Sequence, residues 1–267
     1  MSSGDADVLL EGKGISKRFG GLHALVDVSF SIRRGEIYGL IGPNGAGKTS
    51  LFNVLTGIYE QDAGTFTFDG EPLVGTASHD VAKRGIARTF QNIRLFANLS
   101  ALENVMIGRH VRTRAGVVGA IVRDARTQAE EAAIEERAYR LLEYVGVARR
   151  ANDLAKHLAY GDQRRLEIAR ALATEPKLLA LDEPAAGMNA TETSGLRKLL
   201  EDIRRDGTTI LLIEHDMKLV MSVCDRVLVL DYGRKIAEGS AADVQRDPKV
   251  ISAYLGGEIA LAPANRA

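Results

Sequence analysis

The sequence has 267 residues, 45% of them hydrophobic, which is enough for a substantial core in one large domain or two small ones. Lysine and arginine number 35 and are balanced by 35 aspartates and glutamates, so the charge excludes the strongly basic pattern of a nucleic-acid-binding protein. Cys224 is the only cysteine, which excludes an intramolecular disulfide and suits a reducing cytosol. We see no secretory signal and no apolar run of about 20 residues, and expect a soluble protein that serves a membrane only as a partner.

Predicted strands alternate with predicted helices along most of the chain. Residues 8–19 and 28–32 have the pattern of early antiparallel strands, and the apolar run at 36–42 leads through a glycine loop into a helical segment at 48–57. The continuous apolar runs at 178–182 and 208–215 are typical of buried parallel strands. Residues 226–239 read as a hairpin that turns at Tyr232 and Gly233.

Between about 92 and 157 the strand signal disappears. Residues 124–146 are rich in Ala, Glu and Arg, and their apolar side chains recur near helical spacing. These are Ala132, Ile134, Ala138, Leu141, Leu142 and Val145. We therefore predict one α/β domain over 1–256, with a core at 1–91 and 158–256, a helical subdomain inserted at about 92–157, and a flexible tail at 257–267.

The glycine loop matches the phosphate-binding pattern GxxxxGK[ST] and stands between a predicted strand and a predicted helix. Its glycines allow backbone N–H groups to wrap phosphate oxygens at the helix N-terminus, and an incidental glycine turn is the alternative. Lys48 is expected to reach the terminal phosphates of a bound nucleotide and the Thr49 hydroxyl to bind Mg²⁺. The predicted nucleotide-binding residues here are Gly42, Pro43, Asn44, Gly45, Ala46, Gly47, Lys48, Thr49 and Ser50.

Two carboxylates follow the buried strand predicted at 178–182. Asp182 lies at the C-terminal end of that strand, where α/β sheets bind their ligands, and we assign it to Mg²⁺. Glu183 comes next and is the predicted catalytic group that polarises the attacking water. The alternative is that both carboxylates are solvated turn residues, and the phosphate-binding loop upstream argues against this alternative.

The run LAYGDQRRLEIARALA, from Leu158 to Ala173, resembles the signature motif of ABC-type ATPases, which is LSGGQ followed by a long amphipathic helix. The resemblance implies the P-loop ABC ATPase fold, with a RecA-like core, an antiparallel β subdomain and an inserted α-helical subdomain. In that family the motif caps ATP held by a partner subunit. It therefore implies an ATPase dimer, of identical or related chains, in which nucleotide is contacted in trans by Ala159, Tyr160, Gly161 and Asp162.

Three further residues take their expected roles from the same resemblance. His215, which follows the strand after Asp182, matches the switch histidine that contacts the γ-phosphate. Gln91 in RTFQN matches the glutamine that senses Mg²⁺ and the membrane partner, and we count it with the catalytic and metal-binding residues. Phe19 in SKRFGG resembles the aromatic residue that stacks on adenine, with core packing as the alternative.

Finer similarity points to the ATPases of branched-chain amino-acid uptake. The segments SKRFGGLHAL, GLIGPNGAGKTSLFNVLTG, RGIARTFQNIRLF, DEPAAGMN, IEHDMKLVM and the late AYLG carry it, as does the insertion HVRTRAGVVGAIVRDARTQAEE. Those systems pair two ATPases with two membrane permease subunits and an extracytoplasmic substrate-binding protein. The resemblance implies ATP and Mg²⁺ as cofactors, amino-acid import, no nucleic-acid partner, and a peripheral place on the cytoplasmic face of the inner membrane.

Two positions of the signature run depart from the family. Ala159 stands where the motif has Ser, and Asp162 where it has Gln. Ala159 cannot donate a hydrogen bond to the γ-phosphate, and a bond of this kind contributes about 1.5–3 kcal/mol. The ATP site that this signature completes therefore either hydrolyses ATP slowly or is stabilised sufficiently by backbone N–H groups. Asp162 adds a negative charge near phosphate but can act as a helix cap.

Three other functions remain open at this stage. A lipopolysaccharide-export ATPase shares much of this sequence, although the insertion around 112–126 favours the amino-acid group. A non-transport ABC protein acting on ribosomes or DNA usually has two cassettes or a long coiled coil, for which this chain has no room. A P-loop kinase would explain the glycine loop and leave the signature and His215 unexplained.

Overall fold

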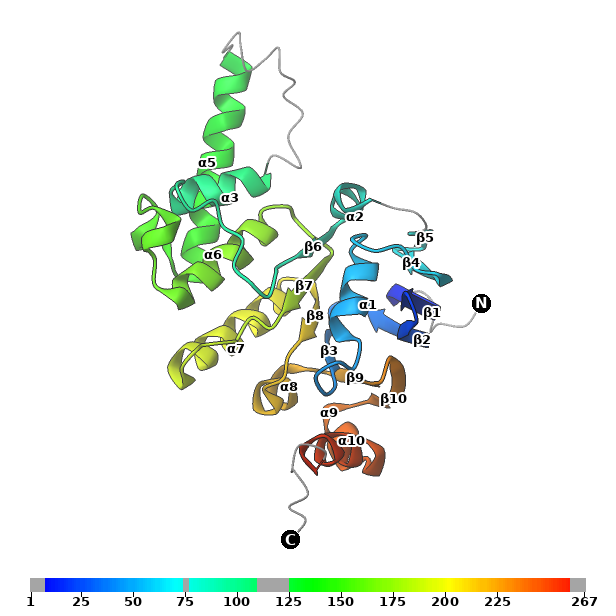
Figure 1. Cartoon of the computed structure of the whole chain (residues 1–267). Coiled ribbons are helices and arrows are strands. Elements are labelled where there is room, and N and C mark those ends of the chain that lie inside the picture. Colours follow the sequence, from blue (N-terminus) through cyan, green and yellow to red (C-terminus); the bar gives the residue numbers. More distant parts are fainter. Residues whose placement is uncertain (1–7, 74–76, 110–124, 260–267) are drawn as a thin grey trace.

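The structure is a computed structural model that describes residues 8–73, 77–109 and 125–259. Its central sheet has six strands (Figure 1). The strand order is β10-β9-β3-β8-β7-β6, and all neighbours are parallel except β10 against β9. The strands are β3 (Ile37–Ile41), β6 (Ile86–Arg88), β7 (Leu178–Asp182), β8 (Thr209–Ile213), β9 (Arg226–Asp231) and β10 (Arg234–Gly239). Every residue of β3, β7 and β8 is buried, which confirms the prediction of buried parallel strands.

A second, antiparallel sheet lies beside the first, in the order β2-β1-β4-β5. Its strands are β1 (Val8–Phe19), β2 (Leu22–Arg33), β4 (Ala63–Phe68) and β5 (Glu71–Pro72). The β1–β2 pair was predicted, whereas β4 and β5 were not recognised. Helix α1 (Lys48–Leu55) packs in a core shared by this sheet and one face of the central sheet (Figure 1).

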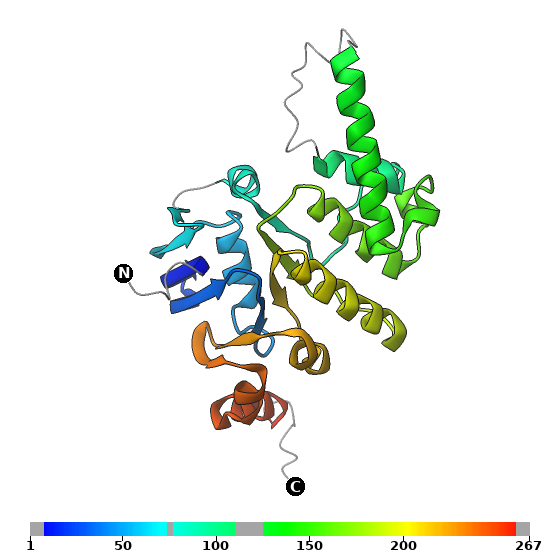
Figure 2. The same ribbon diagram turned by 180° about the vertical axis from the view of Figure 1, so that it is seen from behind.

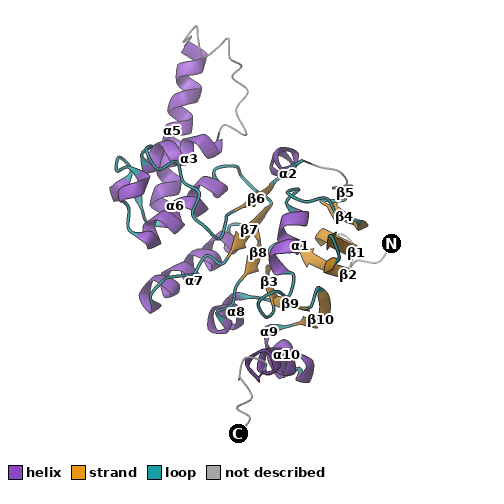
Figure 3. Cartoon of the chain, in the orientation of Figure 1, coloured by secondary structure: helices purple, strands orange, loops and turns teal. Residues whose placement is uncertain are grey.

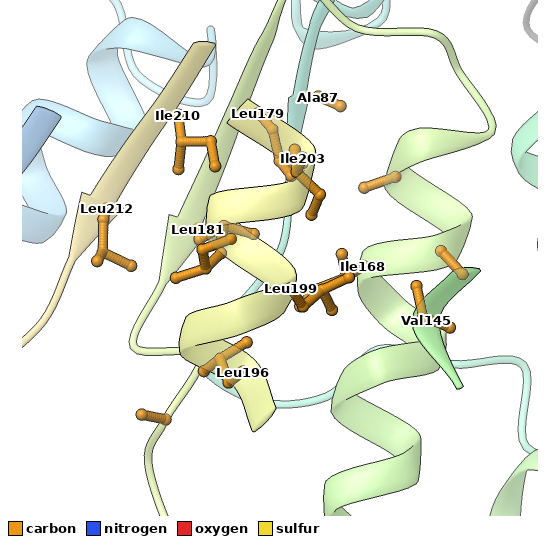
Figure 4. Close-up of a cluster of buried hydrophobic side chains, with 14 of the residues drawn as sticks. Ala87, Val145, Ile168, Leu179, Leu181, Leu196, Leu199, Ile203, Ile210 and Leu212 are labelled. Atoms are coloured by element: carbon orange, nitrogen blue, oxygen red, sulfur yellow. The ribbon is translucent and has the colours of Figure 1, made fainter. Parts of the chain in front are cut away.

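The other face of the central sheet is covered by helices. Helix α7 (Ala190–Arg205) places Leu196, Leu199 and Ile203 against strand residues of β7 and β8 (Figure 4). Short helix α8 (Met217–Val223) lies in the same core, and α2 (Ser78–Arg84) precedes β6. The sequence period of two sends alternate strand residues to the two cores, so Leu179 and Leu181 face α7 while Leu178 and Ala180 face α1.

The segment between β6 and β7 is helical and forms a group at one side of the sheet (Figures 1 and 3). It contains α3 (Ala101–Arg109), α5 (Ala125–Val145), α6 (Tyr160–Leu172) and the short 3₁₀ helices η3 (Ala148–Arg150) and η4 (Ala155–His157). Within its described residues, only an isolated bridge between Ser100 and Leu154 has β character. Most of the predicted insertion, 110–124, lies outside the described residues.

Helix α5 differs from its predicted burial pattern at one position. Five of the six apolar residues listed for it above are buried, whereas Ala132 is exposed. The reason is that the N-terminal part of α5 projects beyond α3 and α6, as both views show (Figures 1 and 2), so no described element covers it. Among the described residues, no helix is long and apolar enough to cross a membrane.

The C-terminal part of the chain contains two helices next to the β9–β10 hairpin, α9 (Ala241–Arg246) and α10 (Pro248–Ile259). The predicted hairpin turn is confirmed, with positive φ angles of 43° at Tyr232 and 75° at Gly233. Helix α10 extends three residues beyond the point where the tail was predicted to begin. A helix that has already formed gains one hydrogen bond for each added residue, so it can continue past a weak sequence signal.

Candidate active site

The phosphate-binding loop joins β3 to α1, and two of its glycines are required by close backbone contacts. A Cβ atom at Gly42 would lie 2.1 Å from the carbonyl oxygen of Leu230. At Gly47, which precedes α1 and has a φ of 101°, it would lie 2.6 Å from the carbonyl oxygen of Ala24. Only glycine fits both positions, so the loop and the helix start are set by these residues.

A cavity of about 440 Å³ lies over the loop and collects most of the predicted residues. Its lining includes Phe19, the loop and helix residues 44–50, Gln91 and Glu183. Four further lining residues, not anticipated from the sequence, are Leu22, His23, Ala24 and Tyr232. They lie on β2 and on the hairpin turn after β9, which the sequence shows as ordinary strand and turn residues without a ligand-binding pattern.

Phe19 lies at the rim of this cavity and keeps 41% of its surface exposed. It meets Tyr59 edge to face, with ring centroids 5.1 Å apart. A core phenylalanine would be buried, so the core-packing alternative is wrong for Phe19. Lys17 Nζ lies over the ring, 5.6 Å from its centroid, and the exposed part of the ring lines the cavity.

Lys48 is the buried cation of the site. Its Nζ donates to the carbonyl oxygens of Gly42, at 2.6 Å, and Pro43, at 3.0 Å. Burial lowers the pKa of Lys48, and the nearby carboxylates of Glu183 and Asp182 oppose this shift. The ammonium group is therefore held at the loop with two carboxylates close enough to favour its charge.

Asp182 ends β7 and is only 4% exposed. Its backbone N–H donates to the Thr89 hydroxyl, 3.3 Å away. Burial raises the pKa of the Asp182 carboxyl, while the guanidinium of Arg88 acts in the opposite direction. A desolvated carboxylate of this kind gains from a cation placed beside it.

The three predicted catalytic side chains meet at the next residue. Glu183 Oε2 accepts a hydrogen bond of 3.0 Å from Gln91 Nε2 and lies 3.8 Å from His215 Nδ1. Glu183 itself has a φ of 48°, a conformation that costs an ordinary residue about 1–2 kcal/mol. Strain of this type is concentrated at functional sites, and here it occurs at the residue whose carboxylate meets the glutamine and the histidine.

Glu214 is a buried neighbour that the sequence reasoning did not single out. Its Oε1 accepts from the backbone N–H of Ala185 at 2.8 Å, and its Oε2 accepts from the N–H of His215 at 3.2 Å. Burial raises the pKa of this carboxyl, against the effect of these hydrogen bonds. Its position near the end of the apolar run 208–215 was the one sequence feature that could have indicated this role. Glu214 connects the histidine loop to the segment that follows Glu183.

The loop after Ala185 ends at Asn189, which caps helix α7. The Asn189 side chain accepts hydrogen bonds from the N–H groups of Thr191 and Glu192, at 2.9 and 3.0 Å. Glu192 bonds back to the N–H of Asn189 at 2.9 Å, which completes a capping box. Capping of helix α7 is therefore a local structural role for Asn189.

The signature residues lie elsewhere, at the start of α6. Helix α6 begins at Tyr160, so Asp162 is in its first turn and the prediction that it caps the helix is wrong. The N-cap is Ala159, which has no side-chain oxygen to cap with. Within the described chain, the lining of the nucleotide-loop cavity contains none of the four residues from Ala159 to Asp162.

A buried arginine joins α6 to the Gln91 loop of the same chain. Arg164 Nη1 donates to the Phe90 carbonyl at 2.7 Å, and its Nη2 donates to the Gln91 carbonyl. It also forms a 3.3 Å ion pair with Glu167, and both side chains are almost fully buried. The signature helix and the glutamine loop are therefore one connected unit.

The site combines a phosphate-binding loop with a buried aspartate, a strained glutamate and a neighbouring histidine. These groups lie at the C-terminal edge of a parallel sheet, and together they define a P-loop ATPase cassette. The sequence profile described as "ABC transporter" matches residues 25–186. A second profile, "Branched-chain amino acid ATP-binding cassette transporter", matches 234–260. The chain belongs to the family of ABC transporter ATP-binding proteins, which are nucleotide-binding ATPase subunits of membrane transporters.

Similar curated proteins extend over the whole cassette. The high-affinity branched-chain amino acid transport ATP-binding protein LivG of Salmonella typhimurium is 45% identical over 249 residues, covering 93% of this chain and 98% of that protein. BraF of Pseudomonas aeruginosa, of the same description, is 43% identical with the same coverage. The lipopolysaccharide export ATP-binding protein LptB of Haemophilus influenzae is 33% identical over 253 residues, covering 95% of this chain and 99% of that protein.

Solved structures agree in fold. A nucleotide-free ATP-binding cassette of an ABC transporter has a TM-score of 0.81 at 31% identity, covering 92% of this chain and 98% of that one. A cassette in its ADP conformation has a TM-score of 0.80 at 30% identity, with 93% and 99% coverage. A dimeric post-hydrolysis cassette bound to ADP and phosphate has a TM-score of 0.74 at 25% identity, with 87% and 99% coverage.

Proposed function

We propose that the chain is the ATP-hydrolysing subunit of an importer for branched-chain or related amino acids. The observation that carries the proposal is similarity to LivG and BraF over nearly their whole length, together with the C-terminal profile match at 234–260. The ATPase does not touch the transported solute, so its contribution is to convert ATP binding and hydrolysis into motion of the membrane subunits.

For hydrolysis, we assign the attacking water to Glu183 and the γ-phosphate contact to His215. The support is geometric, because Gln91 and His215 both approach the same oxygen of Glu183. A carboxylate held between an amide donor and an imidazole is well placed to accept a proton from water. Lys48 and the loop N–H groups bind the phosphates, and the exposed ring of Phe19 stacks on adenine.

The residues present also fit Mg²⁺. We assign it to the Thr49 hydroxyl, the Asp182 carboxylate and the Gln91 amide, which are oxygen ligands of the kind Mg²⁺ prefers. No cluster of three His, Cys, Asp or Glu side chains suited to a metal occurs among the described residues. Nucleotide phosphates and water would supply the other ligands. Mg²⁺ would neutralise developing phosphate charge.

A second cassette would complete the site. The start of α6 carries free N–H groups and the positive end of the helix dipole, which suit a γ-phosphate. Because the signature residues do not line their own chain's cavity, we place Ala159, Tyr160, Gly161 and Asp162 against the nucleotide of a partner, in a homodimer or heterodimer. The similar cassette that forms a dimer with ADP and phosphate bound supports the pairing of two cassettes.

The membrane permeases would dock beside the Gln91 loop. A cavity of about 480 Å³ lies there between the core and the helical group, lined in part by Ile58, Val81, Phe90, Arg94, Phe96 and Ile107. Phe96 is 49% exposed, and its apolar surface is available to a permease helix. We place the chain peripherally on the cytoplasmic face of the inner membrane, with the substrate-binding protein acting through the permeases from the other side.

The test is reconstitution with the cognate permeases and binding protein in liposomes. The proposal expects uptake of labelled leucine, isoleucine or valine that requires ATP on the cassette side and is lost in the Glu183→Gln variant. ATP hydrolysis without uptake of any amino acid would contradict it. The similarity to LptB keeps lipopolysaccharide export as the second candidate, and co-purification with lipopolysaccharide-binding membrane subunits would favour that function.

A further inference from the structure

Arg88 is a partly buried cation to which none of the hydrolytic roles above has been assigned. It is the last residue of β6, the edge strand of the central sheet. Its guanidinium reaches the C-terminal end of helix α1, where Nη1 donates to Asn53 Oδ1 at 3.0 Å and to Thr56 Oγ1 at 2.6 Å. Since α1 begins at Lys48, these two bonds connect the end of β6 to the helix that carries the phosphate-binding lysine.

The same guanidinium also contacts two aromatic rings. Arg88 Cζ lies 4.4 Å from the centroid of the Phe52 ring on α1 and 4.4 Å from the centroid of the Phe90 ring. Arg94 lies over the Phe90 ring as well, 4.3 Å from its centroid. A guanidinium over a ring is attracted by the ring's quadrupole, and more strongly where the pair is desolvated. A chain of contacts therefore runs from α1 through Arg88 to the residue that precedes Gln91.

Backbone pairing of β6 ends just before the Gln91 loop. The register of β6 with β7 ends at Arg88, opposite Ala180, and one further bond of 2.9 Å joins the Thr89 N–H to the Ala180 carbonyl. The next residue, Phe90, is the one whose ring contacts Arg88. Side-chain contacts therefore take over from strand pairing at the point where the chain continues toward Gln91.

The Gln91 loop is held from two sides. On the side of the helical group, Arg164 of α6 donates to the carbonyl oxygens of Phe90 and Gln91. On the side of the core, Arg88 connects Phe90 to α1, whose Phe52 is fully buried. The buried helix is the more rigid support, because close-packed side chains resist displacement. Arg88 thus places the loop relative to α1 and the nucleotide site.

We propose that Arg88 is a positioning residue for ATP hydrolysis, which holds the Gln91 loop against α1 so that the Gln91 amide meets Glu183. The inference rests on the hydrolytic site proposed above, where Gln91 Nε2 donates to Glu183 Oε2 at 3.0 Å. Without the guanidinium, the loop keeps its bonds to Arg164 and follows α6 rather than the core. A displacement of about 1 Å at a reacting group can lower a rate by about 10²-fold. Nucleotide binding is left intact, because Lys48 and the phosphate-binding loop keep their own contacts.

The test replaces Arg88 by methionine, which keeps most of the side-chain length and removes the charge and the donors. The matched control is Arg84→Met, at an exposed arginine of α2 that donates to the Pro72 carbonyl at 2.5 Å. In the assembled transporter, we expect kcat for ATP hydrolysis to fall about ten- to a hundredfold in Arg88→Met. The Kd of ADP, measured on the full chain without Mg²⁺, should stay within about twofold of the parent value. The Arg84→Met control should match the parent in both quantities.

Hydrogen exchange separates positioning from a general loss of structure. The proposal expects faster exchange at residues 90–94 in Arg88→Met, with α1 protected as in the parent. A purely structural role would raise exchange across α1 as well and would weaken ADP binding, and that result contradicts the proposal. Parent-like kcat, or parent-like exchange at 90–94, in folded Arg88→Met overturns the inference.

A double variant tests the same contact from the side of α1. Asn53→Leu combined with Thr56→Val removes both acceptors and keeps the guanidinium charge, so hydrolysis should again slow while ADP binds as in the parent. Parent-like hydrolysis in this variant contradicts the proposal, and the variant decides the question if Arg88→Met fails to fold. Arg88 also lines the cavity proposed for the permeases, so loss of the permeases with parent-like exchange at 90–94 would assign it to docking instead. If Glu183→Gln also hydrolyses ATP like the parent, the hydrolytic site itself is wrongly assigned.

Discussion

The two surfaces proposed to enclose the γ-phosphate, one on the α/β core and one at the start of α6, are built in different ways. On the core, Lys48 and Asp182 are buried, and the carboxylate of Glu183 is held by Gln91. At the start of α6 the cap residue is Ala159 and Tyr160 is 45% exposed. The first surface is fixed by contacts within the chain, whereas the second offers mainly backbone N–H groups and a helix dipole. The core surface can therefore be preorganised in one chain, and the α6 surface acts only when a partner presents it.

Arg164 connects these two surfaces within one chain, through the carbonyls of Phe90 and Gln91. In the proposed dimer, a shift of α6 toward a partner's nucleotide would be transmitted in this way to the glutamine loop of its own site. Substitutions on the core surface are therefore expected to abolish ATP hydrolysis. Substitution of the connecting Arg164 should destabilise the fold, and substitutions at the start of α6 should change the rate of ATP turnover.

The largest effect is expected from Glu183→Gln on the core surface. The amide cannot take a proton from water, so phosphate release should fall by at least about 10²-fold. ATP should still bind, because the loop and Lys48 are unchanged, and should hold the dimer closed in size-exclusion chromatography. Glu135→Gln, on an exposed face of α5, is the matched control and should hydrolyse ATP like the parent. Hydrolysis by Glu183→Gln at the parent rate would show that the catalytic assignment is wrong.

Arg164→Ala breaks the connection between the surfaces. It leaves the buried Glu167 carboxylate without its cation and two backbone carbonyls without a donor, so we expect a loss of about 3–5 kcal/mol in the free energy of unfolding. Within the described part of the chain, the neighbouring Arg165 donates to the Val145 carbonyl alone, and Arg165→Ala should cost about 1–3 kcal/mol. Urea denaturation measures both. Equal losses for the two variants would contradict a special role for Arg164.

Glu214 tests how far the core surface depends on a buried charge. Its pKa is raised by burial, so the folded protein binds a proton more readily than the unfolded chain. The stability gained in this way is fully present below the ordinary glutamate pKa of 4.5 and is lost as the pH rises through the raised pKa. The free energy of unfolding of the parent minus that of Glu214→Gln should thus decrease between pH 4.5 and neutral pH. Denaturation at both pH values checks the sign, and a difference that grows with pH contradicts it.

Much of the core surface could be predicted from the sequence because its motifs are local. The strand before Asp182 and the loop before Lys48 each encode their own geometry, through buried apolar runs and through glycines that no other residue can replace. Contacts between distant segments could not be predicted in this way. The hydrogen bond from the Ala185 N–H to Glu214, for example, depends on tertiary packing that leaves no periodic signal.

At the start of α6, by contrast, even the local structure could not be predicted from the sequence. The helix was expected from the resemblance of this run to the signature motif, with Asp162 able to cap it, whereas the helix begins at Tyr160 and its N-cap is Ala159. Propensity does not identify a helix start that lacks a capping side chain, and Ala159 provides none. In the same way, strands β4 and β5 were missed because they are short and gain their stability from pairing, β4 with β1 and β5 with β4.

The smallest effect is expected at the α6 surface, from Ala159→Ser. A serine hydroxyl can accept a backbone N–H of the first turn and donate to a γ-phosphate at the same time. The cap should add about 1 kcal/mol to the free energy of unfolding, and the new phosphate contact should raise ATP turnover of the assembled transporter by about fivefold. Ala159→Asp separates the two contributions, because it caps the helix equally well and repels phosphate. Turnover should rise with Ser and fall with Asp while both variants are stabilised. An unchanged rate in Ala159→Ser, with unchanged assembly, would mean that the backbone N–H groups of α6 suffice and that this signature does not define a slow site.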